Sequence, residues 1–144
     1  MKAYLGRRYR LSASHRLFSP AFGDEENRAV YGKCANPHGH GHNYVVEVLV
    51  EGEIDPATGM VCDLEELDGC VRREVLEPFD HQNLNTLADF QNRVPTTENL
   101  CIEIAQRLRR ALPARLTLRV RVEETSNNFF EYVEEPSHGI RQTA

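Results

Sequence analysis

The chain has 144 residues, a length typical of one domain, and 40% of them are hydrophobic, which is enough for a core. The formal net charge is -5 with both signs interspersed, which argues against a general nucleic-acid surface. No apolar run approaches the ~20 residues of a transmembrane helix, and the first residues contain no apolar signal region. We therefore expect a cytoplasmic protein with a single domain over residues 1–135 and a flexible tail over residues 136–144.

The first predicted element is a strand over residues 4–17. Its apolar face contains Tyr9, Leu11, Ala13, His15 and Leu17, which alternate with Arg and Ser residues. His15 thus lies inward at the end of the run, where a lone histidine is more often a hydrogen-bonded core residue than a ligand. Residues 18–42 are polar and rich in Gly and Pro, and they are predicted to form a long loop.

That loop ends on the sequence Gly-His-Gly-His-Asn-Tyr at 39–44, and a second strand is predicted over residues 43–53. Side chains at i and i+2 of an extended chain point to the same face, so His40 and His42 project together. Two imidazoles on one side of a strand make half of a tetrahedral metal site. We favour His15 as the third ligand, because it also points inward at a strand end.

The four cysteines are Cys34, Cys62, Cys70 and Cys101, and none of them belongs to a C-x-x-C pair. In a reducing compartment we expect thiols rather than disulfides. The last three fall in or beside apolar helical patterns and are interpreted as small core residues. Cys34 is different, because it stands among Gly, Asn, Pro and His residues just before the histidine pair.

Two helices are predicted after the second strand, over residues 63–77 and 96–112. Asp63 can cap the first, which Pro78 is expected to close. In the second, Leu100, Ile104, Leu108 and Leu112 recur every four residues. The loop between the helices carries Asp80-His81, which in isolation is more typical of a turn with a surface histidine than of an acid/base pair.

Two further strands are predicted, one from Leu116 and one over residues 129–133. Glu124 falls on the inward parity of the first, where a carboxylate is costly unless it has a partner. The pattern does not exclude the alternative, in which the strand has already ended and Glu124 is solvated. Two strands, two helices and two strands predict an α+β fold, with an antiparallel sheet and both helices on one face. Oligomerisation would protect the edges of such a sheet.

These residues could form a metal site, either catalytic or structural. Three neutral histidines bind zinc and leave one position open for water or substrate. Cys34 is either a fourth ligand of a structural zinc site or a thiolate that acts as base or nucleophile. Lys33 or a metal ion would lower the pKa of that thiol. Asp80 can orient His81 or raise its basicity.

Six motifs occur in order along residues 8–135. They are Ser-Ala-Ser-His-Arg at 12–16, Gly-Lys-Cys-Ala-Asn-Pro-His-Gly-His-Gly-His-Asn-Tyr at 32–44, Gly-Glu-Ile-Asp-Pro-Ala-Thr-Gly-Met-Val at 52–61, Asp-His-Gln-Asn-Leu-Asn at 80–85, Pro-Thr-Thr-Glu-Asn at 95–99 and Glu-Thr-Ser-Asn-Asn at 124–128. Together they resemble the 6-pyruvoyl tetrahydropterin synthase family. The resemblance implies the tunnelling fold (T-fold), a four-stranded antiparallel sheet with two helices on one face in the order ββααββ. Trimeric barrels would stack as a hexamer, with active sites at subunit interfaces.

The resemblance also implies a zinc-dependent lyase of tetrahydrobiopterin-type synthesis. The enzyme would eliminate triphosphate from 7,8-dihydroneopterin triphosphate and isomerise the side chain to give 6-pyruvoyl tetrahydropterin. His15, His40 and His42 match the zinc ligands of the family. Zinc there acidifies a C–H bond of the substrate as a Lewis acid.

The remaining site residues also come from the resemblance. Cys34 matches the proton-abstracting base, and Asp80 and His81 match the pair that works with it from a neighbouring subunit. Glu124 matches the carboxylate that anchors the pterin. Thr96 and Thr97 match threonines beside the pterin pocket. Thr96 is also placed to cap a helix. Arg16 and Lys33 are weak candidates for the triphosphate, since exposed cations are usually just solvated.

The sequence departs from the family at two positions, because Ala35 and His38 stand where the family often has Asn. Both lie in the loop that positions Cys34. His38 is therefore either a competing ligand or a spectator.

Three alternatives remain open. The first is 6-carboxytetrahydropterin synthase of queuosine biosynthesis, which uses the same substrate and releases acetaldehyde. In those enzymes the gap between the cysteine and the first histidine is typically shorter than the five residues between Cys34 and His40, so the spacing favours the pyruvoyl enzymes. A non-catalytic zinc- or pterin-binding oligomer would need neither Cys34 nor Asp80-His81, so their presence favours an enzyme. A structural zinc module would unfold on chelation.

Overall fold

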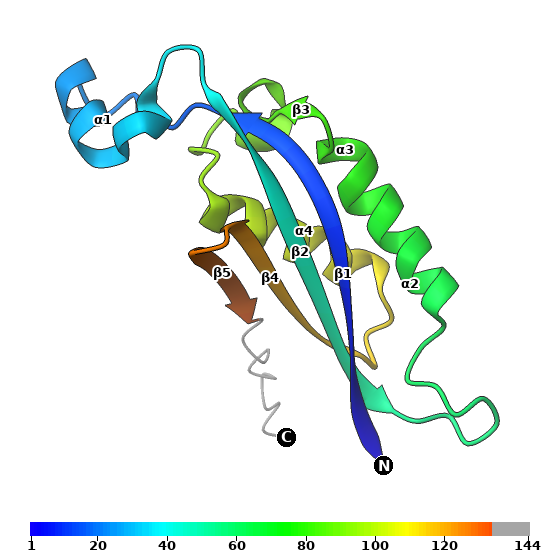
Figure 1. Ribbon diagram of the computed structural model, residues 1–144. Coiled ribbons are helices and arrows are strands. Elements are labelled where there is room, and N and C mark those ends of the chain that lie inside the picture. Colours follow the sequence, from blue (N-terminus) through cyan, green and yellow to red (C-terminus); the bar gives the residue numbers. More distant parts are fainter. Residues whose placement is uncertain (134–144) are drawn as a thin grey trace, which may run out of the picture.

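The computed structural model describes residues 1–133 and is built around two long antiparallel strands, β1 (Lys2–His15) and β2 (His40–Glu53) (Figure 1). They pair along their whole length, from Lys2 opposite Glu53 to His15 opposite His40. On one face of β2 the side chains of Val46, Val48 and Val50 are fully buried. Their branched side chains suit a pleated, buried surface, which explains why this alternating stretch forms a strand.

Three more strands complete the sheet, in the order β3-β1-β2-β4-β5. β4 (Thr117–Thr125) pairs antiparallel with β2, and β5 (Asn128–Val133) pairs antiparallel with β4. β3 (Gln82–Asn83) is parallel to β1. The predicted α+β class and the order of the main elements are confirmed, but the prediction of four antiparallel strands is wrong. A two-residue strand is too short to produce an alternating pattern.

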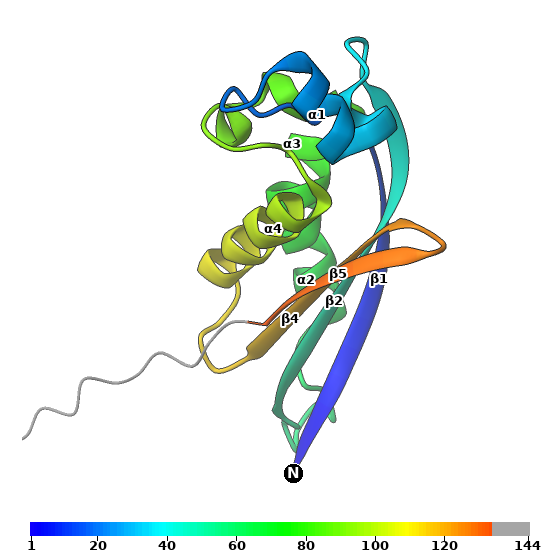
Figure 2. The ribbon, with the colours of Figure 1, turned by 90° about the vertical axis from the view of Figure 1, so that its left-hand side faces the viewer.

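The two helical segments lie on one face of the sheet (Figures 1 and 2). The first consists of α2 (Leu64–Val71), a π-helical turn (Arg72–Leu76) and α3 (Glu77–Phe79), and the second is α4 (Thr97–Ala111). Asp63 caps α2 as predicted, since its carboxylate accepts the backbone N–H of Glu65 at 2.8 Å. Buried side chains of both segments meet the sheet in one core, which includes Leu67, Phe79, Leu100, Ile104, Leu108, Val120 and Val122.

Pro78 lies inside the first helical segment and does not close it, contrary to the prediction. Proline has no N–H to donate to the carbonyl four residues earlier. In the preceding π-helical turn, the N–H of Glu77 donates instead to the carbonyl of Arg72, five residues earlier. This change of register precedes the proline and lets the helix continue to Phe79.

The segment predicted as a loop over residues 18–42 contains a helix, α1 (Asp24–Tyr31), followed by a 3₁₀ turn (Gly32–Ala35). The side chain of Asn27 organises this region, and only 2% of its surface is exposed. Its amide donates to the carbonyls of Ser19, Phe22 and Gly23. A buried amide rather than an apolar stripe holds the helix, so hydrophobic periodicity does not reveal it.

All four cysteines are free, as predicted, and Cys70 and Cys101 are buried. Among residues 1–133 no helix combines the length and apolarity needed to cross a bilayer. The predicted tail over residues 136–144 lies outside the part of the chain that the structure describes.

Candidate metal centre and active site

Three histidine side chains converge where β1 ends and β2 begins. His15 pairs with His40 in the sheet, and His42 lies two residues further along β2 on the same face. The Nε2 atom of His40 is 3.2 Å from that of His15 and 2.9 Å from that of His42. Two nitrogens that bind one zinc ion at ~2.0–2.1 Å with tetrahedral angles lie about 3.3 Å apart. The spacing of these three atoms therefore suits a single metal ion.

His15 is held in a defined orientation. Its Nδ1 atom is 2.9 Å from the carbonyl oxygen of Pro95, so Nδ1 carries the proton and donates it. That tautomer leaves the lone pair on Nε2, the atom that faces the other two histidines. Burial lowers the pKa of His15 to about 4 and also lowers the pKa of His42. Both rings stay neutral at pH 7, as metal ligands must.

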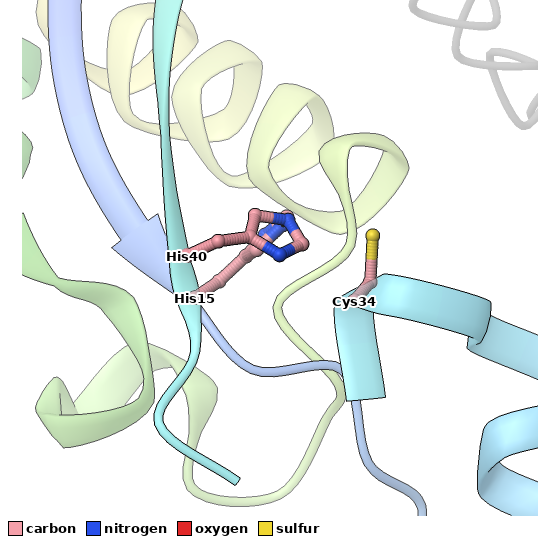
Figure 3. A group of neighbouring side chains, drawn as sticks. All are labelled: His15, Cys34 and His40. Carbon is pink, nitrogen blue, oxygen red and sulfur yellow. The ribbon is translucent and has the colours of Figure 1, made fainter. Parts of the chain in front are cut away.

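Cys34 lies beside this cluster, in the 3₁₀ turn that follows α1 (Figure 3). Its Sγ and the nearest nitrogens of His15 and His40 all lie within 4.8 Å of one another, so the three residues could hold a metal ion. Two contacts position the turn: Leu17 N–H donates to the carbonyl of Cys34 at 2.7 Å, and Arg16 Nε donates to that of Ala35 at 3.3 Å.

The protein alone does not activate this thiol. Burial raises the pKa of Cys34, and the negative charge of Glu124 raises it further. The expectation that Lys33 lowers this pKa is therefore wrong. A cation bound by the histidines would act in the opposite direction and favour the thiolate.

Glu124 points inward, which decides between the two alternatives left open by its position in the sequence. β4 continues to Thr125, and its register shifts between Glu123 and Thr125. The Glu124 side chain is only 16% exposed, and its Oε1 lies 3.6 Å from Nε2 of His42. Its Oε2 accepts a hydrogen bond from the hydroxyl of Thr97. The carboxylate thus has a buried partner and is not solvated.

The two threonines at the start of α4 have different contacts. Thr96 is the N-cap, because its Oγ1 accepts the backbone N–H of Asn99 at 3.2 Å. Thr97 is 2% exposed and holds Glu124. The structure therefore brings Thr97, but not the Thr96 hydroxyl, to the carboxylate.

An open hollow of about 730 Å³ lies beside the cluster, lined by residues that include Arg28, Lys33, Cys34, His40 and His42. Sequence reasoning missed Arg28, because it belongs to the helix that was predicted as loop. The other candidate cation, Arg16, lies with its guanidinium 4.8 Å from the ring centre of Phe18.

His38 stays apart from the metal ligands. Its side chain is exposed, and its backbone N–H donates to the side chain of Asn36. Of the two roles considered for His38, the geometry favours the spectator.

Asp80 and His81 lie elsewhere on the chain. Asp80 Oδ1 accepts the N–H of Ser12 at 2.9 Å, its Oδ2 is 3.1 Å from Nδ1 of His81, and the N–H of His81 donates to the carbonyl of Ser12 at 2.6 Å. The His81 side chain is 82% exposed and lines a second hollow with Ser12, Asn43 and His42, and Cys34 is not part of that lining. Within one chain the structure does not bring this pair to Cys34.

The backbone of His81 is strained, since its φ angle is 59°. Residues other than glycine rarely occupy that region, and they cluster at functional sites when they do. Its contacts with Ser12 and Asp80 maintain the conformation. The exposed, strained histidine is therefore a functional candidate.

Comparison with known proteins identifies relatives along nearly the whole chain. Residues 4–135 match the family described as 6-pyruvoyl tetrahydropterin synthase. The 6-pyruvoyl tetrahydrobiopterin synthase of Homo sapiens is 47% identical over 132 residues, which are 91% of each chain. That of Poecilia reticulata is 48% identical over 130 residues, 90% of this chain and 88% of its own.

A solved structure agrees. The 6-pyruvoyl tetrahydropterin synthase of Caenorhabditis elegans superposes with a TM-score of 0.88 at 39% identity, over 94% of this chain and 97% of its own. These findings confirm the resemblance, the T-fold class and the type of enzyme predicted from the sequence. The chain belongs to the 6-pyruvoyl tetrahydropterin synthase family.

Proposed function

We propose that this protein is a zinc-dependent 6-pyruvoyl tetrahydropterin synthase, which eliminates triphosphate from 7,8-dihydroneopterin triphosphate and isomerises its side chain. One observation carries the proposal: three imidazole nitrogens converge beside a thiol at an open hollow. The names of the relatives support the pyruvoyl product over the carboxy product.

The zinc ligands in this proposal are His15, His40 and His42. The Nε2 spacing of His40 from the other two, and the lowered pKa values of His15 and His42, fit a tetrahedral ion. Bound zinc would supply Lewis-acid chemistry at the hydroxyl groups of the substrate side chain. The open side of the cluster faces the hollow that Cys34 also lines, where a substrate has room to enter.

Cys34 is the base in this scheme and takes the proton from the substrate carbon. Its raised pKa keeps the thiol protonated until a cation is bound nearby, so thiolate formation would be coupled to an occupied site. Its distance from His15 and His40 also permits the alternative role of fourth ligand. Substitution of Cys34 separates the two roles, because only a ligand affects metal content.

Asp80 and His81 act with Cys34 from a neighbouring subunit. Cys34 does not line the hollow beside His81, and His81 is exposed; both observations support an arrangement across an interface. The sheet also ends in strands with exposed apolar residues, since Phe129 and Val133 of β5 are 51% and 57% exposed. A barrel of three joined sheets would cover such edges, and two stacked trimers would form the hexamer.

Glu124 anchors the pterin through its aminopyrimidine edge. A carboxylate can accept two N–H hydrogen bonds side by side, and Thr97 fixes the plane of this one. The triphosphate would meet Arg28 and Lys33, which line the hollow. Arg16 is a poorer candidate, because its guanidinium bonds to Ala35 and covers Phe18.

Product analysis tests the proposal. Zinc-loaded protein is incubated with 7,8-dihydroneopterin triphosphate without reductant, and the mixture is analysed by mass spectrometry, with chelated protein as the control. We expect a pyruvoyl product and free triphosphate. A carboxy product with acetaldehyde would move the enzyme to the queuosine branch, and no conversion by zinc-bound protein would favour a binding protein.

A further inference from the structure

The orientation of His15 depends on a backbone carbonyl that is 80 residues away in the sequence. Nδ1 of His15 donates to the oxygen of Pro95 at 2.9 Å, while the Tyr44 hydroxyl lies further away, at 3.4 Å. A histidine ligand turns about its side-chain bonds unless its second nitrogen is held. The position of the Pro95 oxygen therefore determines where Nε2 of His15 points.

The Pro95 carbonyl belongs to a tight turn. The N–H of Thr96 donates to the carbonyl of Val94 at 2.8 Å, a three-residue γ-turn with Pro95 at its centre. The fixed φ of proline suits this position. Because a γ-turn restricts the peptide units on both sides of its central residue, it fixes the direction of the Pro95 oxygen.

The side chain of Asn99 connects this turn to α4. Its Nδ2 donates to the same Val94 carbonyl at 2.8 Å, and its backbone N–H donates to Oγ1 of Thr96 at 3.2 Å. Val94 thus accepts two hydrogen bonds, one within the turn and one from the helix. Asn99 is the last residue of the Pro-Thr-Thr-Glu-Asn motif, and the proposed chemistry assigns it no role.

α4, which carries Asn99, is anchored in the hydrophobic core. Leu100 and Ile104, which flank the turn of helix after Asn99, are fully buried in the core. On the other side of the turn, the guanidinium of Arg93 bonds to Glu103, which also binds Nε of Arg107 at 3.1 Å. Both ends of the Pro95 turn are therefore attached to one helix.

We propose that Asn99 is a positioning residue of the metal centre, which holds the Val94–Pro95 turn so that the Pro95 carbonyl orients His15 toward the metal. The inference rests on the metal site of the proposed function. It extends that site to a residue that touches neither metal nor substrate.

The variant Asn99→Asp tests this role. It keeps the shape of the side chain but replaces the donor with an oxygen that repels the Val94 carbonyl. We expect the affinity for Zn²⁺ to fall about tenfold, the lower end of the effect of removing an outer-shell partner. The affinity is measured by competition with a chromophoric chelator. A new negative charge alone would favour a cation, so charge does not explain a loss.

Gln91→Glu is the matched control. Gln91 lies in the same loop, and its amide donates to the carbonyls of Asn85 and Leu87, neither of which leads to Pro95. The control loses an equivalent donor and gains the same charge. We expect it to bind Zn²⁺ as the parent protein does.

A spectroscopic measurement separates positioning from loss of stability. In Co²⁺-loaded protein the visible absorption bands report the ligand geometry, and we expect them to change in Asn99→Asp but not in Gln91→Glu. Asn99→Ala removes the donor without adding charge, so it should show the same direction of change if the Asp variant does not fold.

The outcomes distinguish this inference from the proposed function. A folded Asn99 variant with lower thermal stability but unchanged Zn²⁺ affinity and Co²⁺ spectrum would make Asn99 merely structural. A parent protein that does not bind Zn²⁺ would overturn the metal site itself, and with it both proposals.

Discussion

Four of the histidines lie in two contrasting regions. His15, His40 and His42 are brought together by the register of two long strands, and each nitrogen that faces the cluster has a neighbour within 3.2 Å. Asp80 and His81 lie on a strained turn, and the His81 ring is 82% exposed. The three ligand nitrogens of the first region come together within one chain, whereas Asp80 and His81 bond to each other and to the backbone of Ser12 in β1.

This difference indicates how the site is divided. A cluster of converging imidazoles can bind a metal ion as soon as the chain folds. The hollow that His81 lines includes His42 but not Cys34, so within one chain the strained pair lacks the thiol with which it is proposed to act. A single chain would therefore provide a metal centre but only part of a catalytic site. The following experiments test that division.

The largest expected effect comes from His40, whose Nε2 contacts both other imidazoles. His40→Ala should abolish Zn²⁺ binding and turnover, measured by elemental analysis and product formation. His38→Ala is the control, because His38 is exposed and outside the cluster, and it should keep both. A His40 variant that still holds one zinc per chain would contradict the three-histidine site.

Removal of the metal by a chelator should also abolish turnover. The circular dichroism spectrum should persist, because the core of the domain does not depend on the cluster. Unfolding on chelation would instead indicate a structural zinc site.

A pair of inactive variants tests the division of the site between subunits. Cys34→Ala and His81→Ala should each lower turnover by about 10²–10⁴-fold, the usual contribution of a general acid or base. Co-expressed in equal amounts, they should regain activity, because about one quarter of interface sites would combine an intact Cys34 with an intact His81.

The control for this experiment is the double variant Cys34→Ala/His81→Ala co-expressed with either single variant, which can form no intact site. Absence of recovery in the true mixture would mean that the two residues do not act together across an interface. Loss of zinc from Cys34→Ala would identify Cys34 as a ligand rather than a base.

Glu124 lies beside the histidine cluster, and its substitution should have a smaller effect than that of Cys34 or His81. Glu124→Gln should weaken binding of 7,8-dihydroneopterin by about 10–100-fold, the value of one or two hydrogen bonds to a charged group. Isothermal titration with this ligand measures pterin recognition without the triphosphate. Glu123→Gln is the control, since its carboxylate faces Arg121 at 3.5 Å instead of the cluster. Unchanged affinity in Glu124→Gln would contradict the anchor.

Much of the fold follows from periodicity. Alternation located β1, β2, β4 and β5 to within a few residues, and the four-residue spacing of Leu100, Ile104 and Leu108 located α4. The same alternation placed His15 on the inner face, but for Glu124 it left a solvated position open. These elements were predictable because burial against the core controls their sequences.

The missed features are held by polar contacts that leave no periodic pattern. α1 depends on the single buried amide of Asn27, and β3 consists of two backbone pairs. The support of His15 comes from the carbonyl of Pro95, and a backbone oxygen can belong to any residue type. The sequence therefore predicts the site only in part. The candidate ligands are side chains of recognisable type, but the groups that orient them are largely backbone atoms.

Substitution of Arg28 should have the smallest effect. It tests whether α1, the helix that sequence reasoning missed, contributes to substrate binding at the hollow beside the histidine cluster. Arg28→Ala should raise KM several-fold with little change in kcat, because an exposed cation contributes only about 1 kcal/mol to binding an anion. Added salt should reduce the difference between the variant and the parent protein, because ions screen exposed charges.

Inorganic tripolyphosphate identifies what Arg28 recognises. It should inhibit the Arg28 variant less strongly than the parent protein, because it shares only the triphosphate with the substrate. Arg110→Ala is the matched control: Arg110 is also exposed on a helix but lines a different hollow, beside Gln106 and Tyr132. Equal inhibition of the two variants would mean that α1 shapes the hollow without recognising the leaving group. The phosphate contacts would then have to come from other residues, such as those of another subunit.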